Sequence, residues 1–215
     1  MRGFNNRYTD RLLVLIDGRT VYTPITTGVY WDVQDVLLED IERVAVVGAG
    51  ALGAAYAGLL HDMDRDCVSF VAAGERCERL RKEGVSVNGK HYAIPVLAPE
   101  DASPPADLVI VAVKHYHLDE AIRDMKSRVG EGTVLMSLLN GIDSEARLGA
   151  AYGMENVLYA LNMGIDALRE GNRVTYTTQG KIFFGEERNP VVTDRVARVQ
   201  ALFDRAGIVY ETPPD

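Results

Sequence analysis

The sequence has little cysteine, no long apolar run and no concentration of positive charge. Its two cysteines, Cys67 and Cys77, are too few for a disulfide framework, so we expect free thiols of the kind found in cytosolic proteins. No run of about 18 apolar residues occurs, which excludes a membrane-spanning helix. The net charge is −8 and no basic cluster is present, so neither nucleic acid nor an anionic membrane is the expected partner.

The first residues also lack the apolar core of a signal peptide, since Met1 is followed by the polar stretch RGFNN. We therefore expect a cytoplasmic protein. What the chain does have is an ordinary apolar content, 47% of its 215 residues. That is enough for a sizeable core in one large domain, or in one domain with an appendage.

The most informative segment is residues 44–53 (VAVVGAGALG), where an apolar strand runs into a glycine loop and then a helix. Gly48 allows the tight turn, Gly50 lets the backbone approach a pyrophosphate, and Gly53 lets the helix pack on the sheet. The helix N-terminus adds free N–H groups and a positive dipole. A glycine turn without a ligand is the alternative. Because strand, loop and helix are in register, we favour a dinucleotide site that includes Gly48, Ala49, Gly50, Ala51, Leu52 and Gly53.

From residue 43 onward, apolar strand patterns alternate with helical ones. We expect strands, helices and one hairpin in this order: strand 43–47, helix 51–62, strand 67–72, helix 75–83, hairpin 84–96, strand 108–113, helix 118–128, strand 133–138, strands 157–162, 174–178 and 181–184, helix 193–206 and strand 208–210. The short polar turns after residue 157 indicate antiparallel additions. The pattern predicts an α/β fold: a Rossmann-like, doubly wound, mostly parallel sheet with antiparallel additions.

The first 43 residues lie outside that plan. Two short apolar segments, 12–16 and 20–22, flank Asp17 and Gly18, a pair typical of a β-hairpin turn. A short helical stretch is expected at 37–43. We therefore divide the chain into an extra N-terminal hairpin segment, 1–43, and a dinucleotide-binding domain, 44–215.

The end of the second predicted strand selects between the two nicotinamide cofactors. NAD sites carry a carboxylate there, about 20 residues past the glycine loop. Here Ala73 and Gly74 end the strand, and Arg76 and Arg79 follow shortly after Glu75. An arginine in this region can bind the 2′-phosphate of NADP, so Arg76 is a candidate cofactor residue. The alternative is that both arginines lie on the solvated face of the next helix.

Two polar residues follow successive predicted strands. Lys114 ends the strand 108–113, and Asn140 follows the strand 133–138. Ligands bind at the carboxyl ends of parallel strands, so both side chains are candidates for contact with cofactor and substrate. Each residue taken alone also has a non-functional interpretation: Lys114 as a lysine where a strand meets solvent, and Asn140 as part of an ordinary Asn-Gly turn. Because both residues are expected to face the same glycine loop, we predict that Lys114 and Asn140 form a catalytic pair. His115 and His117 lack a third ligand, and we expect no metal site.

Three motifs in this order and spacing resemble the ketopantoate reductase family: GAGALG at 48–53, VAVK ending at Lys114, and LLNGI around Asn140. VAAGERCERLRKEG at 71–84 and DALREGNRV at 166–174 extend the resemblance to the family's N-terminal domain. It implies NADPH-dependent reduction of a small 2-keto acid to a 2-hydroxy acid in pantothenate biosynthesis. It also implies that the glycines hold the pyrophosphate, that Lys114 and Asn140 line the nicotinamide and substrate site, and that Ala167 contacts the cofactor.

The chain departs from the family pattern in two ways. Many members carry an arginine where Ala73 stands. The family's helical C-terminal domain, which supplies a general-acid lysine and a substrate-binding glutamate, has no counterpart in the chain. We therefore expect weak or no turnover by this chain, and a surface prone to homo-oligomerisation or other association.

Residues 2–43 resemble something different, part of the plug domain of outer-membrane TonB-dependent receptors (RGFNNRYTDRLLVLIDGRTVYTPITTGVYWDVQDVLLEDIER). The chain is thus interpreted as a fusion of a plug fragment and a reductase domain. The alternative to an NADPH-binding domain is a non-enzymatic fusion or remnant carrying this fragment.

Overall fold

The computed structural model describes residues 15–16, 19–20, 40–141 and 143–214. The chain divides into two units, residues 1–39 and 40–215. In the first, β1 (Leu15–Ile16) pairs antiparallel with β2 (Arg19–Thr20), in agreement with the predicted hairpin. Its predicted turn at Asp17 and Gly18 lies outside the described residues, as does the start of the predicted helical stretch 37–43. The rest of that stretch, residues 40–43, is not helical.

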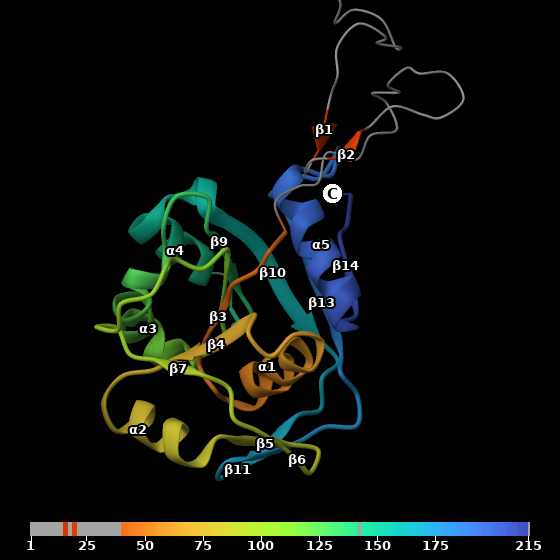
Figure 1. Cartoon of the computed structure of the whole chain (residues 1–215). Helices are drawn as coiled ribbons and strands as arrows, with labels where there is room; N and C mark the ends of the chain where they lie inside the picture. Colours follow the sequence, from red (N-terminus) through yellow and green to blue (C-terminus); the bar gives the residue numbers. More distant parts are fainter. Residues whose placement is uncertain (1–14, 17–18, 21–39, 142, 215) are drawn as a thin grey trace, which may run out of the picture. The chain divides into compact units, whose positions relative to one another are not determined.

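The second unit is built on an eight-stranded sheet in the order β14-β13-β10-β9-β8-β3-β4-β7 (Figure 1). Its strands are β3 (Val44–Val47), β4 (Val68–Val71), β7 (Val96–Leu97), β8 (Leu108–Val111), β9 (Val134–Ser137), β10 (Val157–Met163), β13 (Lys181–Gly185) and β14 (Tyr210–Glu211). All neighbours run parallel except β10 and β13, which are antiparallel. The predicted Rossmann-like, mostly parallel sheet with an antiparallel addition is confirmed.

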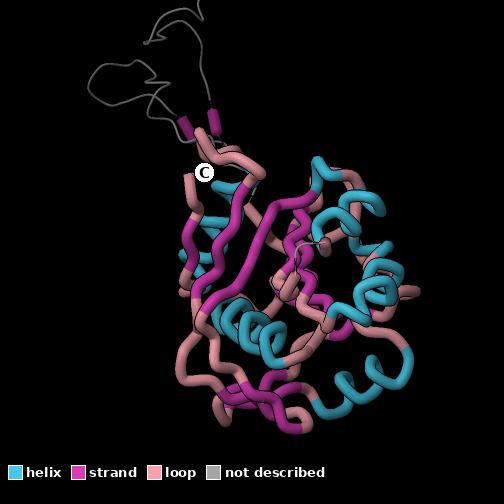
Figure 2. Tube along the Cα trace, turned by 180° about the vertical axis from the view of Figure 1, so that it is seen from behind, coloured by secondary structure: helices cyan, strands magenta, loops and turns pink. Residues whose placement is uncertain are grey.

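Helices cover both faces of this sheet. They are α1 (Ala51–Met63), α2 (Gly74–Glu83), α3 (Leu118–Asp124), α4 (Ser144–Tyr152) and α5 (Asp194–Ala206), with 3₁₀ turns η2 (His115–His117), η3 (Lys126–Arg128) and η4 (Met154–Asn156). Alternate strand residues point to opposite faces, so one set packs with α1 and α5 and the other with α3 and α4. Figure 1 shows these two helix pairs on opposite sides of the sheet, and Figure 2 shows the same layers from behind. Burial on both faces explains why β3 and β8 are continuously apolar.

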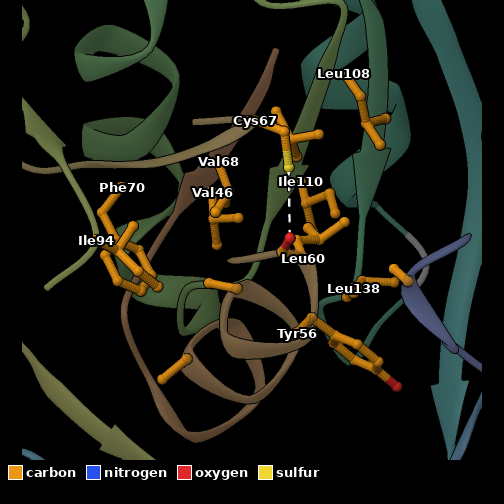
Figure 3. Packing of buried hydrophobic residues seen from close by; sticks show 14 of the residues in the cluster. Val46, Tyr56, Leu60, Cys67, Val68, Phe70, Ile94, Leu108, Ile110 and Leu138 are labelled. Atoms are coloured by element: carbon orange, nitrogen blue, oxygen red, sulfur yellow. Dashed lines mark hydrogen bonds between the residues drawn. The ribbon is translucent and has the colours of Figure 1, made fainter. Parts of the chain in front are cut away.

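The larger of the two clusters lies under α1. Val46 and Ile110 of the central strands lie beside Tyr56 and Leu60 of the helix (Figure 3). The Cys67 thiol donates to the carbonyl oxygen of Leu60 across 3.5 Å. This packing holds α1 close to β3, which matters for the loop that joins them.

A second, four-stranded sheet in the order β11-β12-β5-β6 lies beside α1 and α2 (Figure 1). It contains β5 (Val85–Val87), β6 (Lys90–Tyr92), β11 (Leu168–Glu170) and β12 (Arg173–Thr175). The β5–β6 hairpin matches the predicted one, and its turn has positive φ at Asn88 (48°) and Gly89 (82°). The strand predicted at 174–178 begins earlier and pairs parallel with β5 instead of joining the main sheet. The reason is burial: this pairing places Val174 in the core, 1% exposed.

Two helices differ from the prediction. The helix expected at 118–128 ends at Asp124 and is followed by η3. The helix α4 was not predicted, because only Leu148 among its buried residues is a large apolar side chain. Within the described part of the chain, no helix is long and apolar enough to cross a membrane.

Candidate functional site

A cleft of about 980 Å³ lies at the carboxyl ends of the central strands. The strand β3 has β4 on one side and β8 on the other, so the chain reverses direction across the sheet there. Such a switch point is where open α/β sheets bind ligands. The volume is within the range of roughly 300–1,000 Å³ that is usual for cofactor sites. The position and size therefore suit an extended organic cofactor.

The glycine loop between β3 and α1 forms one wall of the cleft. Gly48 has φ +106°, and a Cβ there would lie 2.7 Å from the carbonyl oxygen of Ala112. A Cβ on Gly53 would lie 1.9 Å from the carbonyl oxygen of Gly48. Gly50 differs, because its φ is −71° and its Cβ would come no closer than 3.7 Å to a protein atom. The protein's own packing thus requires glycine at two of these positions, whereas at the third it leaves open space in the cleft wall.

The N-terminus of α1 faces this space. Gly50 is the N-cap residue, no side chain caps the helix, and its first turn has no acidic residue. The N–H groups that a helix leaves unpaired at its start are therefore available to a ligand, and the dipole favours an anion. Ala49, Ala51 and Leu52 line the cleft beside them, whereas Gly53 lies behind and supports the loop. The open space at Gly50 and the uncapped N-terminus of α1 suit the binding of a pyrophosphate.

Positive charge gathers at the α2 end of the cleft. Arg76 and Arg79 of α2 line it, together with Arg169 of β11, which the sequence analysis did not single out. Burial, with the nearby charges of Arg79 and Arg76, lowers the pKa of Arg169. Arg76 is half-buried and Arg79 is exposed, so the arginines of α2 border the cleft and also lie at the solvated face of the helix.

The opposite end of the cleft carries the two residues predicted as a catalytic pair. Lys114 follows β8, Asn140 follows β9, and both are exposed side chains lining the cleft. Ala167 lines it as well. The structure thus brings the predicted strand-end residues to the same cavity as the glycine loop. A lysine and an amide there can donate to hydroxyl, carbonyl or carboxylate oxygens of a ligand.

Further polar residues near this end were not predicted. The Nε2 atom of His115 lies 2.9 Å from a carboxylate oxygen of Asp143, and this hydrogen bond holds the pKa of Asp143 below its usual value. Asn162 of β10 also lines the cleft and donates to the Tyr56 hydroxyl. No signal in the sequence links these pairs, which are far apart along the chain. Among the described residues no group of three or more His, Cys, Asp and Glu is placed to hold a metal ion.

The sequence of the chain is similar to those of known proteins. The family described as "Ketopantoate reductase PanE/ApbA" matches residues 44–189. The chain is 30% identical over 164 residues to "Uncharacterized oxidoreductase YkpB" of Bacillus subtilis, covering 75% of the chain and 54% of that protein. It is 24% identical to a 2-dehydropantoate 2-reductase of Aquifex aeolicus, covering 78% and 54%. The chain spans about half the length of the curated relatives it matches.

Solved structures give the same result for the fold. The crystal structure of 2-dehydropantoate 2-reductase from Geobacter metallireducens matches with a TM-score of 0.68 at 30% identity, covering 80% of the chain and 58% of that structure. A complex of D-mandelate dehydrogenase with NADH matches with a TM-score of 0.69 at 21% identity, covering 80% and 56%. The second match supports the fold alone.

Proposed function

Because the chain belongs to the ketopantoate reductase PanE/ApbA family of oxidoreductases, we propose that its cleft binds NADPH for the reduction of a small 2-keto acid to a 2-hydroxy acid. The observation that carries the proposal is the single cleft lined by the glycine loop, by arginines at one end, and by Lys114 and Asn140 at the other. When bound, the nicotinamide supplies the hydride. The names of the curated relatives make 2-dehydropantoate the first substrate to test.

The residues of the chain would bind and orient the reactants. The N–H groups at the start of α1, after Gly50, would hold the pyrophosphate, since no side chain caps them and they border the cleft. The Lys114 ammonium would donate to a ribose hydroxyl or to the carbonyl or carboxylate of the keto acid. Asn140 would bridge cofactor and substrate with its amide, and Ala167 would contact the cofactor.

The choice of NADPH over NADH rests on Arg76 and its neighbours at the α2 end. No carboxylate follows β4 at Ala73, the place where an NAD site needs one for the ribose hydroxyls. The titles of the D-mandelate dehydrogenase structures name NADH for those proteins, so NADH is the competing ligand to measure.

We further propose that the 215-residue chain turns over 2-keto acids weakly, acts in the cytoplasm and tends to associate. The described residues that line the cleft and could donate a proton are Lys114, Tyr116, His115 (paired with Asp143) and His117 (paired with Glu120), and the family resemblance assigns the role of general acid to none of them. Alternate residues of β10 expose an apolar row, with Leu161 47% and Met163 60% exposed. An apolar row of this kind favours contact with another protein surface. Light scattering on wild type and Leu161→Gln tests the association.

The experiment that tests the proposed function is a fluorescence titration with NADPH and NADH. Gly50→Asp places a side chain and a negative charge where the pyrophosphate would lie, so it should abolish saturable binding. Ala102→Asp adds the same charge at an exposed loop residue outside the cleft and should bind like wild type. Equal binding by wild type and Gly50→Asp would overturn the proposal. A non-enzymatic remnant carrying a plug-like fragment predicts no binding of either cofactor, and cell-envelope association in fractionation.

A further inference from the structure

Arg169 occupies an unexpected position on the second sheet. It pairs with Val174 of β12, which pairs in turn with Val87 of β5. Directly paired residues share one face of a sheet, and both valines are buried, at 1% and 5% exposure. Arg169 therefore lies on the inner face, whereas its neighbour Leu168 is 60% exposed. The strand turns a charged side chain inward and an apolar one outward, which is the reverse of the arrangement that packing alone favours.

The pairing of β12 with β5 explains how Arg169 reaches the arginines of α2. Gly84 joins α2 directly to β5, so the second sheet begins where that helix ends. Arg76 and Arg79 are three residues apart and so lie on one side of the helix. All three arginines line the cleft, although Arg169 lies far from the other two in the sequence.

Among the residues that the structure describes, the carboxylate of Asp124 interacts electrostatically with Arg76, one of these three positive charges, but does not form an ion pair with it. In the part of the chain that the structure describes, none of them forms an ion pair with a carboxylate. Glu83 also lines the cleft, but it is exposed and bonds to none of them. Both burial and the like charges nearby disfavour the charged form of Arg169, as the lowered pKa indicates. An anion bound among the three guanidinium groups would relieve this repulsion.

The Arg169 side chain is also held in place. Its Nε donates to the carbonyl oxygen of Gly171 at 2.8 Å. This bond orients the planar guanidinium and leaves its terminal nitrogens to form paired hydrogen bonds with phosphate oxygens. Arg79, in contrast, is exposed on the helix surface. A prepositioned arginine loses less side-chain entropy on binding a ligand, so Arg169 should contribute more than either arginine of α2.

We propose that Arg169 is the residue that determines cofactor specificity, completing with Arg76 and Arg79 a site for the 2′-phosphate of NADP; this rests on the proposed function. The second sheet thus supplies a contact that the main sheet lacks, since Ala73, which follows β4, has no polar side chain. Discrimination against NADH then depends on Arg169, which lies almost 100 positions after Ala73, the position after β4 where the residue that selects the cofactor usually stands.

The test compares NADPH and NADH binding by wild type, Arg169→Gln and Arg169→Lys. Loss of hydrogen bonds to a charged group is worth about 1.5–3 kcal/mol, so Arg169→Gln should weaken NADPH binding about tenfold or more. NADH binding should change less than about twofold, because NADH lacks the phosphate. The lysine variant should fall between, since it keeps the charge but not the paired donors. Arg173→Gln is the matched control, removing an exposed arginine of the same sheet that does not line the cleft.

Each outcome decides the matter. Equal weakening of NADPH and NADH by Arg169→Gln would show a merely structural role and overturn the inference, while nucleotide binding and the proposed function stand. No change for either cofactor would also overturn it. Wild type that binds neither cofactor would refute the proposed function, and the inference with it. If Arg169→Gln does not fold, by its thermal melt, Arg169→Lys must still weaken NADPH binding more than NADH binding, and equal binding of both cofactors by that variant and wild type would overturn the inference.

Discussion

The tightest packing in the glycine loop is at Gly53, behind the cleft wall, and we expect the substitution Gly53→Ala to destabilise the fold strongly. Its Cβ would lie 1.9 Å from the carbonyl oxygen of Gly48 and 3.2 Å from the carbonyl carbon. Both are backbone atoms, so no side chain can rotate away. Either α1 must move off β3 or the turn at Gly48 must open. Overpacking of this kind costs about 3 kcal/mol, at the upper end of the usual range.

Thermal unfolding followed by circular dichroism measures this effect. For a protein of this size, each kcal/mol lowers Tm by about 2–4 °C, so Gly53→Ala should melt roughly 6–12 °C below wild type. Gly50→Ala is the matched control: the same methyl group is added three residues earlier, with φ −71° and a nearest protein atom at 3.7 Å. At this N-cap position alanine costs no more than about 1 kcal/mol relative to glycine.

Gly50→Ala and Gly53→Ala should differ from each other in both thermal stability and NADPH binding. Gly50→Ala should fold almost as well as wild type but bind NADPH more weakly, because its methyl group projects into the space left for the pyrophosphate. Gly53→Ala should lose stability first. Melting temperatures within about 2 °C of each other would refute the reasoning, since they would mean that α1 does not pack on the loop as closely as described.

Three further predictions concern the rest of the domain. Arg195 bonds to Glu186 and holds the pKa of its carboxyl below the usual value. Because the pKa of Glu186 is lower in the folded state, this stabilisation is present above the unfolded pKa of about 4.3 and is lost as pH falls through the folded value. The Tm of wild type should therefore exceed that of Glu186→Gln by less at about pH 3 than at pH 7. A Tm difference that stays constant with pH would contradict this. Burial raises the pKa of the Cys67 thiol to about 11 and also raises that of Cys77, so iodoacetamide at about pH 8 should label neither until denaturant is added, as mass spectrometry would show. Phe203 is fully buried against α1 and the sheet, and Phe203→Ala should lower the unfolding free energy in urea by about 3–5 kcal/mol, with a loss under about 1 kcal/mol contradicting that packing.

Most of the main sheet could be predicted because its signals are local. A parallel strand covered on both faces is largely apolar; β3 and β8 are apolar throughout, and β9 is apolar except for Ser137. The glycine loop marks where the first helix begins, and α1 starts at Ala51 as expected. The helix α4 was missed for the opposite reason: its small and polar residues give no clear helical period.

Only the β5–β6 hairpin of the second sheet could be predicted, because the pairing of β12 with β5 is not local. The pairing of Val174 with Val87 joins segments far apart in the sequence, and no pattern in either segment identifies the other as its partner. The same limit applied to the site. Residues at strand ends, such as Lys114 and Asn140, could be placed at the cleft from the rule for parallel sheets. Arg169 could not, since its inward orientation depends on that long-range pairing.

The glycine loop itself supports a ligand-binding role beyond what its pattern alone conveys. Gly48 and Gly53 are required by the protein's own backbone, through a positive φ at one and contact with a carbonyl oxygen at the other. Those two would be needed even in a turn that bound nothing. Gly50 is not explained in this way, because its φ suits any residue and a Cβ there meets only ordinary contacts. A loop that had only to fold could carry a side chain at this point, where it would also cap α1. Its absence leaves uncapped N–H groups beside open space, and a bound phosphate would satisfy those groups.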